Sequence, residues 1–215
     1  MAYNKDFIIS FVRHGESCGN VGIPYEPEFQ TDDPPLSPRG IIEAQKLGKS
    51  SVTDSVDRIF SSTLIRAVQT AYPTAEKLNK EIILLSDLME VGTRIAGADI
   101  NTLKNNYPLA RICLSEPTPS GGLLLLGNET AELTALRAKR CIDYIFSVAN
   151  EGEHILVVSH GTYFGYLLRA ALGLSLPESF CWQVDNCSMT RVIFRKDALP
   201  KLSFTNYTGH LLNNP

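Results

Sequence analysis

The segment FIISFVRHG, residues 7–15, decides the fold class of this chain. Its apolar run, Phe7 to Val12, is short and ends abruptly in polar residues, which is typical of a strand buried on both faces of a parallel sheet. Ile155 to Val158 is a second such run. The first run is followed by Arg-His-Gly and the second by Ser-His-Gly, and Arg58 to Phe60 lies in a third run. Ligands of open α/β sheets bind beyond the carboxyl ends of the strands. We therefore expect His14 and His160, which leave two of these strands, to face each other across one crevice.

Helical patterns separate the predicted strands. Pro38 to Lys49 follows Ser37, a favourable N-cap, and has proline at its first position, where the missing N–H costs nothing. Apolar residues at helical spacing predict a second helix from Leu64 to Leu78, which Pro73 should kink or split in two. The clearest apolar stripe predicts a long helix from near Asn128 to Ala149. This alternation predicts an α/β three-layer sandwich, with a mainly parallel central sheet flanked by helices.

The chain is expected to form a single domain over residues 1–215, because it contains no repeat and no linker-like tract. Two long loops interrupt the alternation, and long loops in compact domains are usually functional. Gly92 to Gly127 is assigned as a lid or cap at the entrance of a pocket, and Gly19 to Pro35 as part of its rim. Near the C-terminus we expect one more strand, Met189 to Phe194, followed by a polar tail.

Composition excludes several classes of protein. Of the 215 residues, 44% are apolar and 20% are charged, so the chain can bury a core and is not disordered. The net charge of −3 provides no overall positive field for nucleic acid or anionic lipid, so any site for a polyanion must be local. No apolar run approaches the ~20 residues that cross a bilayer, and the N-terminus turns polar too soon for a signal peptide. We expect a cytoplasmic protein with no nucleic-acid or membrane partner.

The remaining cysteines, histidines and leucines receive ordinary structural interpretations. Five cysteines without a C-x-x-C pair suit reduced thiols better than disulfides or a zinc site; they are Cys18, Cys113, Cys141, Cys181 and Cys187. Cys18 lies near the expected site but has no base to activate it. His154 and His210 are interpreted as surface or loop residues, and the run Leu123 to Leu126 as core or lid packing.

A dense positive pocket is the main functional prediction from these residues. Arg66 is expected in the first turn of the helix after the third strand, so the site would unite Arg13, His14, Arg66 and His160. Guanidinium groups bind phosphate oxygens in bidentate fashion, so this concentration of positive charge suits a dianionic phosphate.

Several motifs, in their order along the chain, resemble the histidine phosphatase superfamily, in its phosphoglycerate mutase-like first branch. The matching segments are FVRHGESCGN at 11–20, PLSPRG at 35–40, SSTLIRAVQTA at 61–71, VVSHG at 157–161 and VDNCSMTRVIF at 184–194. One R-H-G triplet would be weak support, whereas an ordered set is strong support. The resemblance extends from about Phe7 to Phe194.

The resemblance implies a chemical role for each matching residue. His14 would be the nucleophile that forms a phosphohistidine, which water then hydrolyses. This requires a neutral imidazole, whose pKa nearby arginines should depress and whose tautomer a backbone acceptor should fix. Arg13, Arg66 and His160 would hold the phosphoryl oxygens. Additional expected substrate-binding residues are Asn20, Ser17 and Gly161. The scheme needs neither a metal nor a cofactor.

Glu90, in the segment DLMEVG, matches the position of the family's general acid. A leaving alkoxide needs a proton, so the scheme requires such a group. Many relatives continue with a glycine and tryptophan-glutamate pattern, whereas this chain continues VGTRIAGADI. Asp87 is therefore kept as a second candidate for the acid, and Glu16 as a third.

Three functions fit these motifs. The first is hydrolysis of a small phosphorylated metabolite, and the second is a phosphoglycerate mutase, which needs extra positive charge to grip its substrate. Residues 91–127 contain only Arg94, Lys104 and Arg111 as basic residues, which favours hydrolysis. The third is a non-catalytic module that binds a phosphorylated partner, and the intact set of catalytic residue types argues against it. Exposed sheet edges would permit a homodimer.

Overall fold

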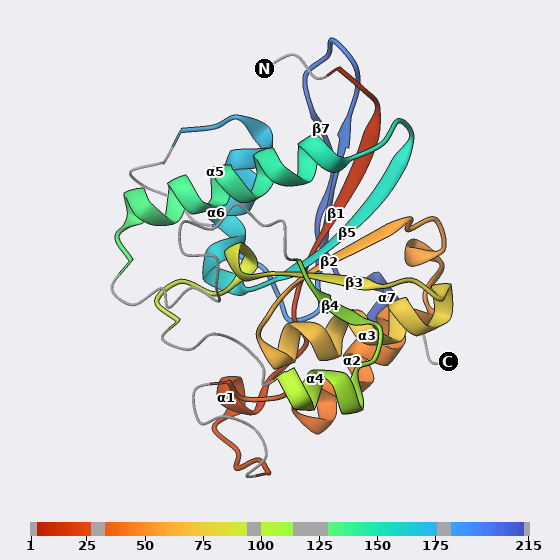
Figure 1. Cartoon of the computed structure of the whole chain (residues 1–215), viewed down its shortest axis with the longest axis vertical. Helices are drawn as coiled ribbons and strands as arrows, with labels where there is room; N and C mark the ends of the chain where they lie inside the picture. The colour runs from red at the N-terminus through yellow and green to blue at the C-terminus, as the bar shows by residue number, and fades with distance from the viewer. Residues whose placement is uncertain (1–3, 27–32, 94–99, 114–128, 176–181, 213–215) are drawn as a thin grey trace.

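The computed structural model describes residues 4–26, 33–93, 100–113, 129–175 and 182–212. Its centre is a seven-stranded sheet in the order β4-β3-β2-β5-β1-β6-β7 (Figure 1). The strands are β1 (Phe7–Arg13), β2 (Arg58–Ser62), β3 (Ile82–Leu85), β4 (Ala110–Ile112), β5 (Glu153–Ser159), β6 (Met189–Phe194) and β7 (Lys201–Tyr207). The five strands from β4 to β1 are parallel, whereas β6 runs antiparallel to both of its neighbours.

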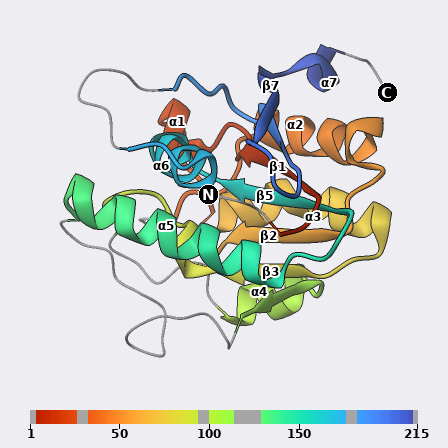
Figure 2. The ribbon, with the colours of Figure 1, turned by 90° about the horizontal axis from the view of Figure 1, so that it is seen from above.

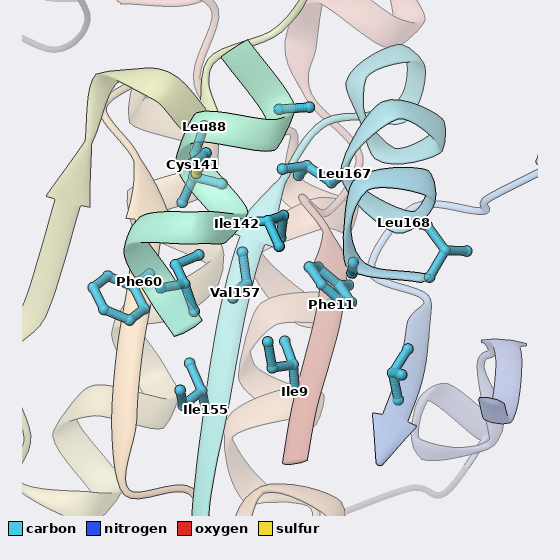
Figure 3. Packing of buried hydrophobic residues seen from close by; sticks show 14 of the residues in the cluster. Ile9, Phe11, Phe60, Leu88, Cys141, Ile142, Ile155, Val157, Leu167 and Leu168 are labelled. Atoms are coloured by element: carbon cyan, nitrogen blue, oxygen red, sulfur yellow. The ribbon is translucent and has the colours of Figure 1, made fainter. Parts of the chain in front are cut away.

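Helices cover both faces of this sheet, because successive residues of the buried strands point to opposite sides. Ile155 and Val157 of β5 pack with α5 (Ala131–Val148) and α6 (Gly161–Leu172). Leu156 and Val158 pack with α2 (Pro38–Lys49) and α3 (Ile65–Leu78). Figure 3 shows the first of these layers, with Ile142 of α5 against Val157 and Phe11. The predicted three-layer α/β fold with a mainly parallel sheet is confirmed.

The helix α3 is continuous across Pro73, so of the two predicted outcomes the split into two helices is wrong, while the kink stays a prediction. Proline removes one intrahelical hydrogen bond, and tertiary packing must offset that loss. Pro73 lies against Gly48 near the end of α2, at a point where a Cβ on Gly48 would lie 2.7 Å from the Cβ of Pro73. Close packing of the two helices at this point supports the uninterrupted helix.

The C-terminal segment is not merely a polar tail. It forms β7, which pairs with β6, and the short helix α7 (Gly209–Leu212). The helix α7 lies beside α2 (Figure 2), and Lys46 Nζ donates a 2.8 Å hydrogen bond to the carbonyl of Leu211. Five of the seven residues of β7 are exposed, Leu202 and Tyr207 among them, and none is buried, so the strand lacks the buried apolar run of the central strands. The strand β7 is stabilised by its hydrogen bonds to β6, which its own sequence does not predict.

His154 and His210 are both 3% exposed, so their assignment to the surface or to loops was wrong. The ring of His154 lies between the hydroxyls of Ser10 and Ser55, at 2.9 and 2.8 Å. His210 Nε2 lies 3.0 Å from the carbonyl oxygen of Cys187. Buried imidazoles need polar partners, and here those partners come from distant parts of the chain.

The segment predicted as a lid contains regular structure where the structure describes it. Within residues 92–127, the edge strand β4 pairs with β3, and α4 (Ile100–Asn106) places Leu103 in the core on the α2 and α3 face of the sheet. Residues 94–99 and 114–128, which include Arg94 and the run Leu123 to Leu126, lie outside the described residues. The expected lid therefore stays a prediction.

The remaining elements are short: α1 (Cys18–Val21) and two 3-10 turns, η1 (Ser51–Thr53) and η2 (Ser86–Leu88). Among the described residues no disulfide links Cys18, Cys113, Cys141 and Cys187, and Cys181 lies outside the described residues. Among the helices described, none is long and apolar enough to span a bilayer.

Candidate active site

His14 and His160 lie side by side at the carboxyl ends of two adjacent parallel strands. The register of β1 and β5 pairs Arg13 with Ser159, so the residue that follows each strand is a histidine. The backbone N–H of His14 donates to the carbonyl of Ser159 at 2.9 Å, and the ring centroids of the two histidines are 5.1 Å apart. Both side chains are buried. The predicted convergence of the two imidazoles is confirmed.

The tautomer of His14 is set by a backbone carbonyl. Its Nδ1 lies 2.7 Å from the carbonyl oxygen of Gly15, which can only accept, so Nδ1 carries the proton. The lone pair therefore lies on Nε2, toward which Arg66 Nε donates at 3.3 Å. Burial, followed by the charges of Arg66 and Arg13, holds the pKa of His14 well below its usual 6.5. At neutral pH the ring is a neutral imidazole whose unprotonated nitrogen, Nε2, accepts from Arg66.

Arg66 is held in place by Asp33, a residue that sequence analysis missed. Both carboxylate oxygens of Asp33 accept from the backbone N–H of Ile65, at 3.0 and 2.9 Å, at the start of α3. Arg66 Nη1 lies 3.4 Å from the same carboxylate. Burial raises the pKa of Asp33 to about 6, although the Ile65 hydrogen bond and Arg66 both lower it. No local pattern connects residue 33 with residue 66, so only the folded chain reveals this pair.

Arg13 crosses directly over Gly161. Its Nη1 donates to the carbonyl of Val184 at 2.7 Å, while its buried Nε has no partner among the described residues. A Cβ on Gly161 would lie 3.1 Å from that Nε. Gly161 therefore leaves room for the Arg13 guanidinium at the beginning of α6. A contact between Gly161 and a substrate stays a prediction.

The ring of His160 is fixed from one side by Ser62, at the end of β2. Its Nε2 lies 2.8 Å from Ser62 Oγ, whereas its buried Nδ1 has no partner among the described residues. Burial lowers the pKa of His160 well below 6.5, and the charges of Arg66 and His14 lower it further. Ser62 was not singled out in the sequence, although it belongs to the SSTLIRAVQTA segment.

Glu90 lies at the N-terminus of α6, close to both arginines. Its carboxylate accepts from the backbone N–H groups of Tyr163, at 2.9 Å, and Thr162, at 3.2 Å. Carboxylates are stabilised at helix N-termini by unpaired N–H groups and by the helix dipole. The side chain is half-buried and acts electrostatically on Arg13 and Arg66. This geometry places Glu90 beside the cluster of arginines and histidines.

A buried arginine fixes the chain immediately before Glu90. Arg137 of α5 donates to the carbonyls of Asp87, at 2.8 Å, and Met89, at 2.9 Å. It also pairs with both oxygens of Glu129 at 2.8 Å and lies 3.8 Å over the ring of Tyr163. The sequence around Arg137 did not predict this anchoring role, because the groups that Arg137 contacts come from other segments of the chain.

Asp87 and Glu16, the other candidates for the acid, are engaged elsewhere. Asp87 is buried and accepts from Arg140 Nε and Nη2 at 2.6 and 2.5 Å. Glu16 accepts from Ser37 Oγ at 2.7 Å and pairs with Arg39. Of the three carboxylates, Glu90 is the one bonded to the start of α6, beside the histidines.

Ser17 and Asn20 form a reciprocal cap at the start of α1. Asn20 N–H donates to Ser17 Oγ at 3.2 Å, and Ser17 N–H donates to Asn20 Oδ1 at 3.1 Å. Asn186 Nδ2 donates both to Asn20 Oδ1 and to the carbonyl of His14, each at 3.2 Å. This link holds Asn20 next to the His14 loop, while its role toward a substrate stays a prediction. The described residues contain no cluster of three or more His, Cys, Asp or Glu able to hold a metal ion.

Comparison with known proteins identifies the family. The sequence model of one protein family, the histidine phosphatase superfamily (branch 1), matches residues 9–207. The chain belongs to this superfamily. The chain is 29% identical to a probable phosphoglycerate mutase of Proteus mirabilis over 188 residues, covering 87% of this chain and 85% of the relative. It is 27% identical to phosphoserine phosphatase 1 of Hydrogenobacter thermophilus over 202 residues, covering 92% of each.

Solved structures of related proteins agree with the fold of this chain. A mutant phosphoserine phosphatase of Entamoeba histolytica, in complex with phosphoserine, superposes with a TM-score of 0.67 at 26% identity. That match covers 96% of this chain and 100% of the other. A phosphoglycerate mutase of Bacillus anthracis has a TM-score of 0.65 at 19% identity, covering 97% and 96%, which supports the fold alone. The relatives and neighbours are phosphatases or mutases, so the expectation of an enzyme is confirmed.

Proposed function

We propose that this protein is a metal-independent phosphomonoester hydrolase that acts through a phosphohistidine intermediate. One observation carries the proposal: a neutral imidazole whose Nδ1 proton is held by Gly15 has its Nε2 lone pair beside Arg66 and opposite His160. The Nε2 lone pair accepts from Arg66 Nε, and an arriving phosphoryl oxygen can take over that donor, which leaves the lone pair for attack on phosphorus.

The geometry supports a two-step reaction. His14 Nε2 attacks phosphorus, the ester P–O bond breaks, and the protonated carboxyl of Glu90 gives its proton to the leaving alkoxide. In the second step a water oxygen attacks phosphorus, Glu90 takes back a proton, and the N–P bond breaks to release inorganic phosphate. Arg13, Arg66 and His160 hold the phosphoryl oxygens during both steps, where positioning and charge supply most of the catalysis.

Hydrolysis is favoured over mutase activity by the distribution of positive charge. A mutase must grip a second anionic group while its substrate reorients. Arg111, one of the three basic residues between 91 and 127, lies on the edge strand β4 and pairs with Glu81 at 3.3 Å. The sheet order separates β4 from β1 by three strands, so Arg111 adds no charge to the pocket.

A small phosphorylated metabolite is the proposed substrate. Phosphoserine phosphatases are among the relatives, and one solved neighbour contains phosphoserine. The half-buried Glu90 and buried histidines suit a compact ester that enters a narrow pocket. A cytoplasmic location and a homodimer are further expectations.

Release of inorganic phosphate from an aryl phosphate, in the presence of a chelator, tests the proposal. The wild-type protein should turn over without added metal, and His14→Ala should lose activity while retaining its circular dichroism spectrum. Loss of activity on chelation would contradict the metal-independent scheme. Exchange between phosphoglycerates with little phosphate release would instead indicate a mutase, and phosphate binding without turnover would indicate a binding module.

A further inference from the structure

The hydroxyl of Ser62 can donate one hydrogen bond, and few acceptors lie within its reach. The side chain is fully buried. Its Oγ accepts from the backbone N–H of Leu64 at 3.2 Å and lies 2.8 Å from His160 Nε2. Leu64 N–H is a donor, so among the described residues the only hydrogen-bond acceptor for the Ser62 proton is the ring nitrogen of His160.

The alternative arrangement would leave a buried donor unsatisfied. If His160 Nε2 carried the ring proton, the Ser62 hydroxyl proton and the Nδ1 lone pair would both lack a partner, whereas with the proton on Nδ1 only the Nδ1–H lacks one among the described residues. Unsatisfied buried polar groups are strongly disfavoured in proteins. Ser62 therefore donates to Nε2, and the proton of the neutral ring lies on Nδ1.

The second ring nitrogen of His160, Nδ1, is open toward the nucleophile. It is buried and has no partner among the described residues, although its ring centroid lies 5.1 Å from that of His14. Arg66, His14 and Arg13 all act electrostatically on this ring. An N–H donor left open beside the nucleophile and two guanidinium groups fits an oxyanion of the substrate.

We propose that Ser62 is a positioning residue that keeps His160 in its Nδ1-protonated tautomer, so that Nδ1–H donates to a phosphoryl oxygen. The inference rests on the proposed function for the identity of the anion, but the tautomer itself does not depend on it. Ser62 acts through His160 and does not touch the substrate.

Side-chain ¹⁵N NMR of histidine tests the tautomer directly. At pH 7.5 the wild-type His160 signal, assigned by its loss in His160→Gln, should show a protonated Nδ1 and an unprotonated Nε2. A proton on Nε2 in the wild-type protein would overturn the proposal. This measurement requires no turnover, so failure of the proposed hydrolysis would not obscure it.

Variants of two neighbouring serines separate positioning from packing. Ser61 is equally buried and on the same strand, but its hydroxyl donates to the carbonyl of Ser62 rather than to His160. We expect Ser62→Ala to mix the tautomers of His160, to weaken inhibition by inorganic phosphate about tenfold, and to lower kcat for an aryl phosphate by about tenfold or more. Ser61→Ala should leave all three close to wild type.

Ser62→Thr keeps a hydroxyl and should restore the tautomer and most of the phosphate affinity. Equal losses in Ser61→Ala and Ser62→Ala would overturn the proposal, because they would indicate a general packing effect. Unchanged phosphate inhibition in a folded Ser62→Ala would also overturn it. If Ser62→Ala fails to fold, the wild-type spectrum and Ser62→Thr still decide the outcome. An Nδ1-protonated His160 in a protein that hydrolyses no phosphate ester would support the tautomer and contradict the proposed function.

Discussion

All four histidines of this chain are buried, but they have two kinds of surroundings. His14 and His160 lie beside arginines at the ends of strands, whereas His154 and His210 bond to serine or backbone oxygens away from that pocket. Burial lowers the pKa of each of them. Burial therefore keeps imidazoles neutral in the active site and in the structural core alike.

The buried ring of His154 should make the protein sensitive to acid. Burial is the largest cause that lowers its pKa from 6.5 to about 4, with Arg191 contributing. The unfolded chain then binds the proton more readily, so this contribution to stability is complete above about pH 6.5 and is lost as the pH falls toward 4. At pH 4 this difference in proton binding lowers the free energy of unfolding by roughly 3 kcal/mol, compared with its value above pH 6.5.

Urea unfolding at pH 4.5, 5.5 and 7 checks this expectation. His154→Gln should be less stable at pH 7, because it alters the contacts to Ser10 and Ser55, but its stability should fall less steeply with acid. The other three histidines contribute equally to both proteins and cancel in the comparison. Parallel pH profiles for the two proteins would show that His154 does not couple to folding in this way.

Glu90→Gln should slow esters with poor leaving groups more than aryl phosphates, if Glu90 is the general acid. Glutamine can still accept from Tyr163 N–H, so the start of α6 should remain intact. General acid catalysis contributes roughly 10²–10⁴-fold, and an aryl oxide scarcely needs it. The measurement is kcat/KM for an alkyl and an aryl phosphate.

Asp87→Asn is the matched control for this variant, because Asp87 is bonded to Arg140 and not to α6. It should change both rates by a similar factor. Leaving-group dependence in Asp87→Asn, with none in Glu90→Gln, would transfer the role of the acid to Asp87.

At the scale of elements, the contact between α2 and α3 depends on the absence of a side chain. A Cβ at Gly48 would lie 2.7 Å from Pro73 Cβ and 2.8 Å from its carbonyl carbon. Neither atom is the flexible end of a side chain, so the helices would have to move apart. The packing of α2 against α3 also holds the segment that supplies Arg66 to the site.

Gly48→Ala should lower the free energy of unfolding by about 1–3 kcal/mol, the usual cost of overpacking. Gly165→Ala, within α6, is the matched control, because its Cβ would meet only Arg169 Nη1, at 3.5 Å. Alanine is the better helix former by about 1 kcal/mol, so this control should be neutral or stabilising. Denaturant unfolding measures both, and equal stability of the two variants would rule out the steric explanation.

At the scale of the whole molecule, a net negative protein concentrates positive charge in one pocket. The chain has 20 Lys and Arg against 23 Asp and Glu, yet Arg13 and Arg66 both approach the two central histidines. A local field of this kind binds a dianion without attracting polyanions to the rest of the surface. Phosphate should therefore stabilise the entire fold by binding to the native state alone.

Inorganic phosphate should raise the melting temperature of the wild-type protein with a concentration dependence set by its Kd. At 100 times Kd the stabilisation is about 2.7 kcal/mol. Arg66→Gln should greatly reduce this shift, whereas Arg39→Gln, which changes an exposed arginine, should preserve it. Thermal unfolding at increasing phosphate is the measurement, and equal shifts in the two variants would place the main phosphate site elsewhere.

Local pattern was sufficient to predict the strands β1, β2, β5 and β6, the helices α2, α3 and α5, and the site that the central strands form, whereas β3 and α6 were not predicted. Phe7 to Val12 and Ile155 to Val158 are continuous apolar runs, and burial on both faces of a parallel sheet requires that pattern. The order of the motifs also predicted the superfamily. The convergence of His14 and His160 followed from the rule that parallel strands end at the same edge.

Only the tertiary structure revealed the partners that orient the site. Ser62 contacts His160, Asp33 contacts Arg66, and Arg137 fixes the chain before Glu90, across separations of 98, 33 and about fifty residues. The burial of His154 and the strand β7, in which no residue is buried, were likewise not predicted from the sequence. Hydrophobic periodicity depends on neighbours a few residues apart, so it is visible in the sequence. Hydrogen bonds between side chains depend on which strands and helices become adjacent, and that is decided only when the chain folds.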